Sequence, residues 1–235
     1  MKFIDAAKNK KMGVVRKMKN YYEHYDFHFS KLDRKKKYRI LEIGVKNGGG
    51  LWTLKKYFPN SSITGLDILD CLQYGSNEDD VQVFVGDQTD LDMLDKLHKD
   101  RGPFDIIIDD GGHTMEQQIA SFMHLFQLLA TGGIYIVEDL HTSYWPKFGG
   151  GISFFGQAKE DTMMNCLKLL TDKSTARWAS RIDRATPYFN TNDFDYCDRY
   201  IESIHYHDSM CFIYKNYFDV NEVGSQYYKN LMISI

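Results

Sequence analysis

Cysteine is scarce in this chain of 235 residues, which contains four cysteines, at positions 71, 166, 197 and 211. No two of them form a Cys-x-x-Cys pair, so the sequence indicates neither a zinc site nor a disulfide framework. Scattered thiols fit a reducing compartment, and the opening residues lack the apolar run of a secretory signal. These absences predict a cytoplasmic protein.

Long apolar runs and an excess of charge of one sign are also missing. No stretch of about 18 apolar residues occurs, so the sequence predicts no membrane span. The formal net charge is -3 at pH 7, so no overall basic field favours a nucleic acid as partner. Hydrophobic residues make up 43% of the chain and charged residues 26%, values typical of a globular protein that buries a core.

Short apolar runs alternate with helical periodicity along the middle of the chain. We expect strands at residues 39–44, 62–67, 81–85, 104–109 and 133–138, with helices at 50–58, 89–99 and 115–129. Two later runs, 201–207 and 210–215, flank Asp208-Ser209 and predict a terminal antiparallel hairpin. Because strands that alternate with helices favour a parallel sheet, the expected fold class is α/β with a mostly parallel seven-stranded sheet.

Segments outside this alternation are harder to assign. Residues 1–37 are basic and aromatic, which fits a helical cap over a pocket, a patch for an anionic ligand, or a solvated helix with its aromatic side packed down. Residues 146–156 predict a loop, either a lid or a passive surface segment, before a helix at 157–172. We therefore divide the chain into an N-terminal helical cap segment (1–37), a main domain (38–216) and a C-terminal tail (217–235).

A glycine-rich turn follows the first expected strand. It reads LEIGVKNGGG over residues 41–50, so that Glu42 precedes Gly44 and two further glycines open the next helix. Glycines let the backbone approach a ligand closely, and the spacing is not the Gly-x-Gly-x-x-Gly of nicotinamide-dependent oxidoreductases. Glu-x-Gly-x-x-x-Gly instead resembles the first motif of S-adenosylmethionine methyltransferases. We therefore assign four residues to a cofactor site: Glu42, Gly44, Gly48 and Gly49.

Carboxylates at the ends of the second and third expected strands extend this cofactor site. Asp67 ends the second strand about twenty residues beyond the glycines, where a carboxylate can accept both hydroxyls of a ribose. Ile68 follows it, and Asp87 and Gln88 end the third strand, where the adenine edge lies in this class. The sequence therefore adds these four residues to the cofactor site, with a simple capping role as the alternative for Asp67.

Acidic pairs also end the fourth and fifth expected strands. Asp109 and Asp110 precede Gly-Gly-His, and Glu138 and Asp139 end the next strand along the chain. Ligands of open α/β sheets bind at this edge, where Asp110, Glu138 and Asp139 would supply three hard oxygen ligands suited to Mg²⁺. Crowded carboxylates repel each other unless a cation or protons compensate. Alternatively, the first pair caps a helix and the second lies exposed in a loop.

These motifs together carry a family resemblance. Residues from about 38 to 145 resemble the metal-dependent sugar O-methyltransferases of macrolide antibiotic pathways, of the mycinamicin and tylosin type. The segments that carry the resemblance are LEIGVKNGG, IIIDDGGHT, GGIYIVEDLHTSYW and, near the end of the chain, IESIHYHDSMCFI. The resemblance implies a Rossmann-like class I methyltransferase fold, S-adenosylmethionine and Mg²⁺ as cofactors, and a homo-oligomer.

The resemblance also implies residue roles. It places Asp110, Glu138 and Asp139 on the metal and makes His113 the general base, and it turns Asp109 toward the methionine end of the cofactor. Tyr144 and Trp145 follow the second acidic pair and are candidates for stacking on a sugar ring, with ordinary packing as the alternative. The family often has serine where this chain has Gly50.

The predicted function is S-adenosylmethionine-dependent, Mg²⁺-assisted methyl transfer to a hydroxyl of a sugar or sugar-linked group. The acceptor would be a natural-product glycoside, a nucleotide sugar or a surface polysaccharide. The sequence is rich in Lys, Asn, Ile and Tyr, a usage that hints at an AT-rich bacterial genome and so favours the polysaccharide. Three alternatives stay open: an oxidoreductase, a metal-independent methyltransferase, and a non-catalytic cofactor-binding subunit. A chelator separates the second, since its activity would survive metal removal.

Overall fold

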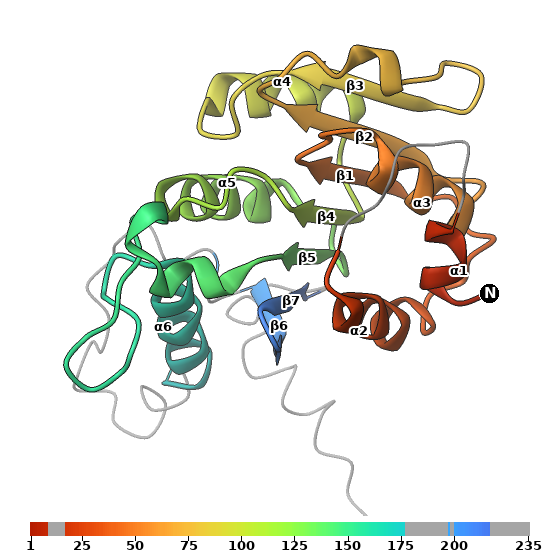
Figure 1. Ribbon diagram of the computed structural model, residues 1–235. Helices are drawn as coiled ribbons and strands as arrows, with labels where there is room; N and C mark the ends of the chain where they lie inside the picture. The colour runs from red at the N-terminus through yellow and green to blue at the C-terminus, as the bar shows by residue number, and fades with distance from the viewer. Residues whose placement is uncertain (9–16, 177–196, 198–199, 217–235) are drawn as a thin grey trace, which may run out of the picture.

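A seven-stranded sheet with helices on both faces forms the body of the protein (Figure 1). The computed structural model describes residues 1–8, 17–176, 197 and 200–216. The strands are β1 (Arg39–Ile43), β2 (Ser62–Asp67), β3 (Val81–Val85), β4 (Ile106–Asp109), β5 (Ile134–Val137), β6 (Ile201–His207) and β7 (Met210–Lys215). They lie in the order β3-β2-β1-β4-β5-β7-β6.

The strand directions confirm the fold predicted from the sequence. Strands β1 to β5 pair in parallel, while β7 pairs antiparallel with β5 and β6 pairs antiparallel with β7. The chain runs outward from β1 through β2 to β3 and then crosses back to β4, which lies on the other side of β1. A crevice therefore opens at the carboxyl ends of β1 and β4, the place where ligands bind in open α/β sheets.

Helices connect these strands and flank the sheet. They are α1 (Phe3–Ala7), α2 (Lys19–Phe29), α3 (Gly49–Tyr57), α4 (Leu91–Arg101), α5 (Met115–Leu128) and α6 (Met163–Ala176), with short 3₁₀ turns η1 (Leu72–Tyr74), η2 (Leu140–Tyr144) and η3 (Pro146–Phe148). No helix in the described part of the chain is long and apolar enough to cross a membrane.

The start of α6 is a correction to the sequence analysis. A helix was expected from residue 157, but the chain first forms a bridge between Ile152 and Ala158. The helix begins only at Met163, where the Thr162 hydroxyl accepts a hydrogen bond from the Asn165 backbone N–H. A threonine in this position satisfies a backbone donor that has no partner within the helix, so the N-cap fixes the start.

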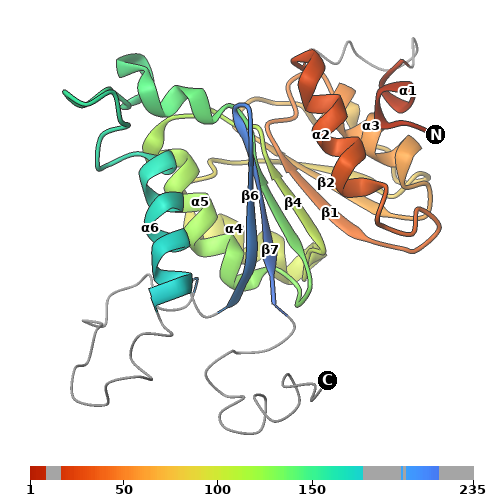
Figure 2. The same cartoon turned by 90° about the horizontal axis from the view of Figure 1, so that it is seen from below.

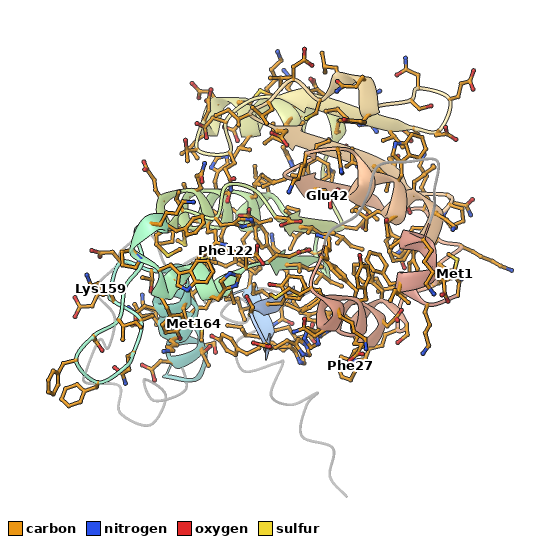
Figure 3. All side chains as sticks on the ribbon, in the orientation of Figure 1. Met1, Phe27, Glu42, Phe122, Lys159 and Met164 are labelled. Atoms are coloured by element: carbon orange, nitrogen blue, oxygen red, sulfur yellow. The ribbon has the colours of Figure 1, made fainter. Side chains whose placement is uncertain are left out.

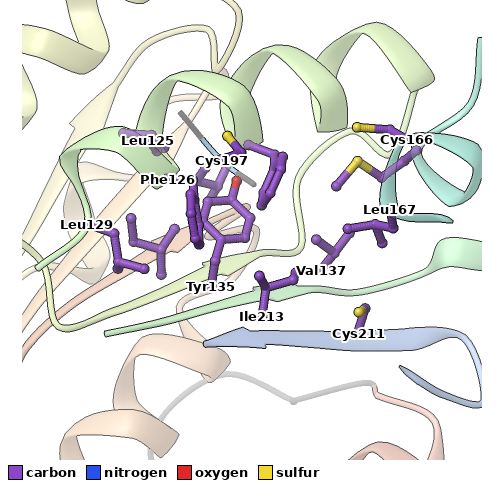
Figure 4. Close-up of a cluster of buried hydrophobic side chains, with 14 of the residues drawn as sticks. Leu125, Phe126, Leu129, Tyr135, Val137, Cys166, Leu167, Cys197, Cys211 and Ile213 are labelled. Atoms are coloured by element: carbon purple, nitrogen blue, oxygen red, sulfur yellow. The ribbon is translucent and has the colours of Figure 1, made fainter. Parts of the chain in front are cut away.

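Alternate residues of each central strand point to opposite faces and build two buried clusters. On β5, Tyr135 and Val137 pack with α4, α5 and α6, while Ile134 and Ile136 pack with α1, α2 and α3. Figure 2 shows these two groups of helices on opposite sides of the sheet, and Figure 4 shows part of the first cluster between α5, α6, β5 and β7.

The N-terminal segment packs its aromatic side against the sheet. This agrees with the alternative in the sequence analysis of a solvated helix whose aromatic side is packed down. Tyr21, Tyr25 and Phe29 of α2 are almost wholly buried and share a cluster with Ile40 of β1. Phe27 lies on the outward side of the same helix and is 54% exposed (Figure 3). The domain boundary at residue 37 stays a prediction, and the predicted tail 217–235 lies outside the described residues.

Lys215, the last residue of β7, closes the C-terminal end of α5. Its side chain is 3% exposed, and Nζ donates to the carbonyl oxygens of Phe126, Gln127 and Leu129 at 3.0, 2.8 and 2.7 Å. The last carbonyl groups of a helix receive no hydrogen bond from within the helix, so a buried helix end needs a donor from elsewhere. Lys215 therefore ties the terminal hairpin to the helix.

Replacing Lys215 by methionine is expected to lower the free energy of unfolding by about 2–4 kcal/mol, because buried carbonyl groups lose their donor. Urea unfolding followed by circular dichroism measures this change. Lys168→Met on the exposed side of α6 is the control, and its effect should stay within about 0.5 kcal/mol. Equal stability of the two variants would mean that the carbonyl groups find other partners.

A group of histidines joins α2 to the terminal hairpin. His28 is 0% exposed, its Nδ1 lies 2.7 Å from the Tyr214 hydroxyl, and its Nε2 lies 2.8 Å from Nε2 of His207. The ring stacks on Phe212 with centroids 3.8 Å apart. Burial, and then the neighbouring His207, His205, Lys31 and His24, lower the pKa of His28 to about 3. The folded protein therefore holds this imidazole neutral.

Acid is expected to weaken the folded state through His28. Because its pKa is lower in the folded than in the unfolded chain, the unfolded chain takes up the proton first as the pH falls. The contribution of neutral His28 to the free energy of unfolding is fully present above about pH 6.5 and is lost as the pH falls toward 3. The free energy of unfolding then falls by up to about 1.4 kcal/mol per pH unit. Urea unfolding of wild type and His28→Phe between pH 7 and 4.5 measures the slopes. Identical slopes in the two proteins would show that His28 does not contribute to the loss of stability in acid.

Candidate active site

A cavity of about 610 Å³ lies at the carboxyl ends of the parallel strands. It is bounded by the ends of β1 and β2, by the turns that follow β1, β2, β3 and β4, and by three residues from elsewhere, Lys17, Gln117 and Asp139. Six predicted cofactor residues line it: Glu42, Gly44, Asp67, Ile68, Asp87 and Gln88. Three others do not, and these are Gly48, Gly49 and Asp109.

The glycine-rich turn is shaped by contacts that exclude larger side chains. Gly44 has a φ of 91°, and a Cβ there would overlap the carbonyl group of Asp110. Gly48 has a φ of 73° at the N-cap of α3. A Cβ on Gly50 would overlap the carboxylate of Glu42 in its present position. The backbone of the glycine-rich turn and the backbone that follows β4 therefore lie in close contact at the cavity floor.

Glu42 brings an unpartnered acidic atom to this floor. The residue is 2% exposed, and its Oε2 has no hydrogen-bond partner among the described residues. Burial raises the pKa of Glu42 to about 8, with Lys17 opposing and Asp110 and Glu138 adding to the rise. A buried, unpaired carboxyl oxygen is costly, so its presence at a cavity indicates a group that binds there.

Two further carboxylates keep the turns in place around the cavity. Asp67 accepts hydrogen bonds from the backbone N–H groups of Val45 and Lys46, each at 2.8 Å, and so connects the ends of β2 and β1. Asp87 accepts from the backbone and the hydroxyl of Thr89, both at 2.9 Å. Both side chains belong to residues of the cavity wall, as the sequence predicts for residues that contact a cofactor.

Asp109 lies beneath the wall of the cavity. The side chain is 0% exposed and accepts from Ser121 Oγ at 2.7 Å and from Gln88 Nε2 at 3.1 Å. Gln88 in turn accepts from the backbone N–H of Gly112 at 3.1 Å. Asp109 therefore orients Gln88 and the Gly-Gly turn, whereas the sequence analysis turned it toward the cofactor itself.

An acidic cluster lies at one side of the cavity, after β4 and β5. His113 Nε2 lies 3.3 Å from Asp139 Oδ2 and 3.7 Å from Asp110 Oδ1. Ligand atoms of these three residues lie within 4.8 Å of one another, an arrangement that can hold a metal ion. The His113 and Asp139 backbones have φ values of 59° and 56°, a conformation that costs a non-glycine residue about 1–3 kcal/mol. Such strain is concentrated at functional sites.

Glu138, the third predicted ligand, lies deeper than the other two. Its side chain is 1% exposed and does not line the cavity. It is joined to Asp110 through Lys17, whose Nζ lies 2.5 Å from Asp110 Oδ2 and 2.6 Å from Glu138 Oε1. Burial and the charge of Asp110 raise the pKa of Glu138, while Lys17 and Tyr25 act in the opposite direction.

The N-terminal segment supplies site residues that the sequence analysis missed. Lys17, Tyr21 and Tyr25 are four residues apart, so on a helix they share one face. Tyr21 donates to Asp139 Oδ1 at 2.6 Å and Tyr25 donates to Glu138 Oε1 at 2.5 Å. Together with the two ion pairs of Lys17, these bonds place a donor on each carboxylate of the cluster.

The predicted acceptor residues lie beyond the acidic cluster. Tyr144 ends η2, and Trp145 follows it with 51% of its surface exposed. The Trp145 ring meets His141 edge to face, with centroids 4.6 Å apart. Neither aromatic residue lines the cavity, so the structure leaves a sugar-stacking role as a prediction.

The chain has relatives among characterised proteins, although no family model matches it. It is 36% identical over 201 residues to mycinamicin VI 2''-O-methyltransferase of Micromonospora griseorubida, covering 82% of this chain and 47% of that protein. It is 36% identical over 209 residues to demethylmacrocin O-methyltransferase of Streptomyces fradiae, covering 86% of this chain and 49% of that protein.

A solved structure shows the same relationship. The mycinamycin-pathway methyltransferase MycE, in complex with Mg, SAH and mycinamycin VI, matches with a TM-score of 0.73 and 32% identity, over 91% of this chain and 53% of that one. The chain spans about half the length of the relatives it matches. The chain thus has the Rossmann-like class I methyltransferase fold of these relatives and is similar to them in sequence over more than four fifths of its own length.

Proposed function

We propose that the protein is an S-adenosylmethionine-dependent O-methyltransferase that acts on a hydroxyl of a sugar or sugar-linked group with the help of a divalent cation. One observation carries the proposal. A single cavity brings the glycine-rich turn and Asp67 together with the acidic cluster and His113. Relatives of this chain are named as sugar O-methyltransferases, which supports the same reaction.

The residues of the cavity fit the cofactor. The unpartnered Oε2 of Glu42 matches a cationic amino group, and Gly44 and Gly50 of the glycine-rich turn line the same cavity. Asp67 and Asp87 offer carboxylate oxygens along the same wall. When bound, S-adenosylmethionine supplies the methyl group. Asp109 and Gln88 would hold the floor in place, since both are already tied by hydrogen bonds.

The acidic cluster fits a divalent cation such as Mg²⁺. Asp110, Glu138 and Asp139 offer the oxygen donors that this ion prefers. A bound cation would lower the pKa of an acceptor hydroxyl and fix its orientation. These three side chains would hold the ion, and the hydrogen bond from Tyr21 keeps Asp139 oriented toward the cluster.

His113 is suited to accept the proton of the acceptor hydroxyl. Its Nε2 faces Asp110 and Asp139 at the edge of the cavity, and its Nδ1 has no hydrogen-bond partner among the described residues. Two carboxylates near an imidazole stabilise the imidazolium that forms when it takes up a proton. Histidine is also the side chain that most often acts as a general base in enzymes.

The acceptor is the least constrained part of the proposal. A natural-product glycoside and a surface polysaccharide both present neighbouring hydroxyls, and Tyr144 and Trp145 offer exposed aromatic surface beyond the cluster. We further propose that the protein works in the cytoplasm as a homo-oligomer. The buried thiols Cys71, Cys166 and Cys211 support a reducing location, and the family resemblance supports the oligomer.

A metal-independent methyltransferase is the second candidate, and Lys17 favours it. Its ammonium already places a positive charge between Asp110 and Glu138. Transfer of a radiolabelled methyl group to a panel of glycosides, with Mg²⁺ or with EDTA, separates the candidates. We expect transfer with Mg²⁺ and none with EDTA. Transfer that survives EDTA would favour the second candidate, and cofactor binding without transfer to any glycoside would favour a non-catalytic subunit.

A further inference from the structure

We propose that Lys17 competes with the divalent cation for Asp110 and Glu138, so that these two carboxylates bind either the ammonium group or the metal. Metal binding would then expel the Lys17 side chain from the site. The inference rests on the metal site of the proposed function, and it assigns a regulatory role to a residue of the N-terminal segment.

The contacts of Lys17 are those that a metal would need. Its Nζ lies 2.5 Å from Asp110 Oδ2 and 2.6 Å from Glu138 Oε1, and the side chain is 7% exposed. Mg²⁺ binds its oxygen ligands at about 2.0–2.1 Å and requires near-octahedral geometry around itself. An ion that takes these two oxygens would occupy the volume of the ammonium group, and the two positive charges would repel each other.

The neighbouring contacts allow Lys17 to move while the helix stays in place. Lys17 precedes the first residue of α2, and Met18 between them is 43% exposed. The helix itself is held by the buried Tyr21 and Tyr25, which donate to Asp139 and Glu138. Rotation about the backbone and the four side-chain bonds of Lys17 can therefore release the ammonium group without undocking α2.

The charges of the cluster explain why such a residue is useful. Asp110, Glu138, Asp139 and the buried Glu42 lie around one site, and like charges in a cleft destabilise each other. Lys17 compensates them when no metal is bound, so the cluster stays assembled. The cost is a weaker apparent affinity for the metal, because each binding event must break the two ion pairs of Lys17.

Lysine acetylation of the wild-type protein, read by mass spectrometry, tests the displacement directly. Without metal, Lys17 should be protected, because its side chain is buried and ion-paired. With saturating Mg²⁺, its rate of acetylation should rise by about tenfold or more, while that of the exposed Lys19 stays constant. Unchanged protection of Lys17 with Mg²⁺ bound would overturn the proposal.

Calorimetric titration of Mg²⁺ alone into wild type, Lys17→Met and Lys19→Met gives the second test. Competition predicts a dissociation constant for Mg²⁺ about tenfold to a hundredfold lower in Lys17→Met than in the other two proteins. Equal constants in all three proteins would overturn the competition while leaving the metal site intact. Binding to none of them would overturn both the competition and the metal part of the proposed function. The acetylation experiment needs no variant, so it decides the question even if Lys17→Met fails to fold.

Discussion

Replacing Asp110 by asparagine is expected to lower the rate of methyl transfer by roughly 10²–10³-fold or more, while the affinity for S-adenosylhomocysteine stays within about tenfold. The carboxylate contacts Lys17 and faces His113. Asparagine keeps the size of the side chain but loses the charge that a cation needs. Glu138→Gln should behave in the same way. Initial rates and calorimetry with the same preparations measure the two quantities.

Asp92→Asn is the matched control for this loss. Asp92 is exposed in the first turn of α4 and does not line the cavity, so its variant should retain wild-type rate and affinity. If Asp110→Asn and Glu138→Gln instead lost cofactor binding, the acidic cluster would belong to the cofactor site. Wild-type rates in both variants would leave the carboxylates with a structural role only.

Removing the imidazole of His113 by an alanine substitution is expected to slow methyl transfer by about 10²–10⁴-fold, the usual contribution of a general base. His113 lies at the cavity wall in a left-handed backbone conformation, with a φ of 59°, and faces two carboxylates. A loss of the base should also change the pH dependence of the rate. Rates across a pH series, in the presence of saturating cofactor, measure both effects.

His124→Ala separates this effect from a general loss of histidine. His124 lies on α5 and pairs with Asp95 at 2.8 Å, outside the residues that line the cavity. Its variant should keep the wild-type rate and pH profile. A near-normal rate in His113→Ala would exclude this imidazole as the base, and its buried Nδ1 would then need another explanation.

Much of the sheet could be predicted because its signals are local. The runs at 62–67 (SITGLD) and 81–85 (VQVFV) are short and contain residues that favour strands, and the strands β2 and β3 have the same bounds. The hairpin around Asp208-Ser209 was equally clear, because alternation and a turn signal agree. The start of α6 was missed because Ile152 and Ala158 pair through a backbone bridge around a turn, which helical periodicity does not signal.

The meeting of these residues at one cavity could be predicted because parallel strands end at one edge, so residues after consecutive strands lie close together there. The position of Asp109 could not, because the direction of its side chain depends on Ser121 and Gln88 from other elements. Lys17 was equally invisible, because 93 residues separate it from Asp110. Only the spacing of Lys17, Tyr21 and Tyr25 hints that one helix face carries donors, and spacing alone does not tell what they meet.

Isothermal titration of S-adenosylhomocysteine into the wild-type protein and into Asp67→Ala tests the central claim most directly. Each protein is titrated with Mg²⁺ and with EDTA. The account predicts micromolar binding to the wild type in both conditions, and roughly tenfold or weaker binding to Asp67→Ala, since a charged hydrogen-bond acceptor is lost. Absence of binding to the wild type in both conditions would contradict the account and leave the glycine-rich turn without a ligand.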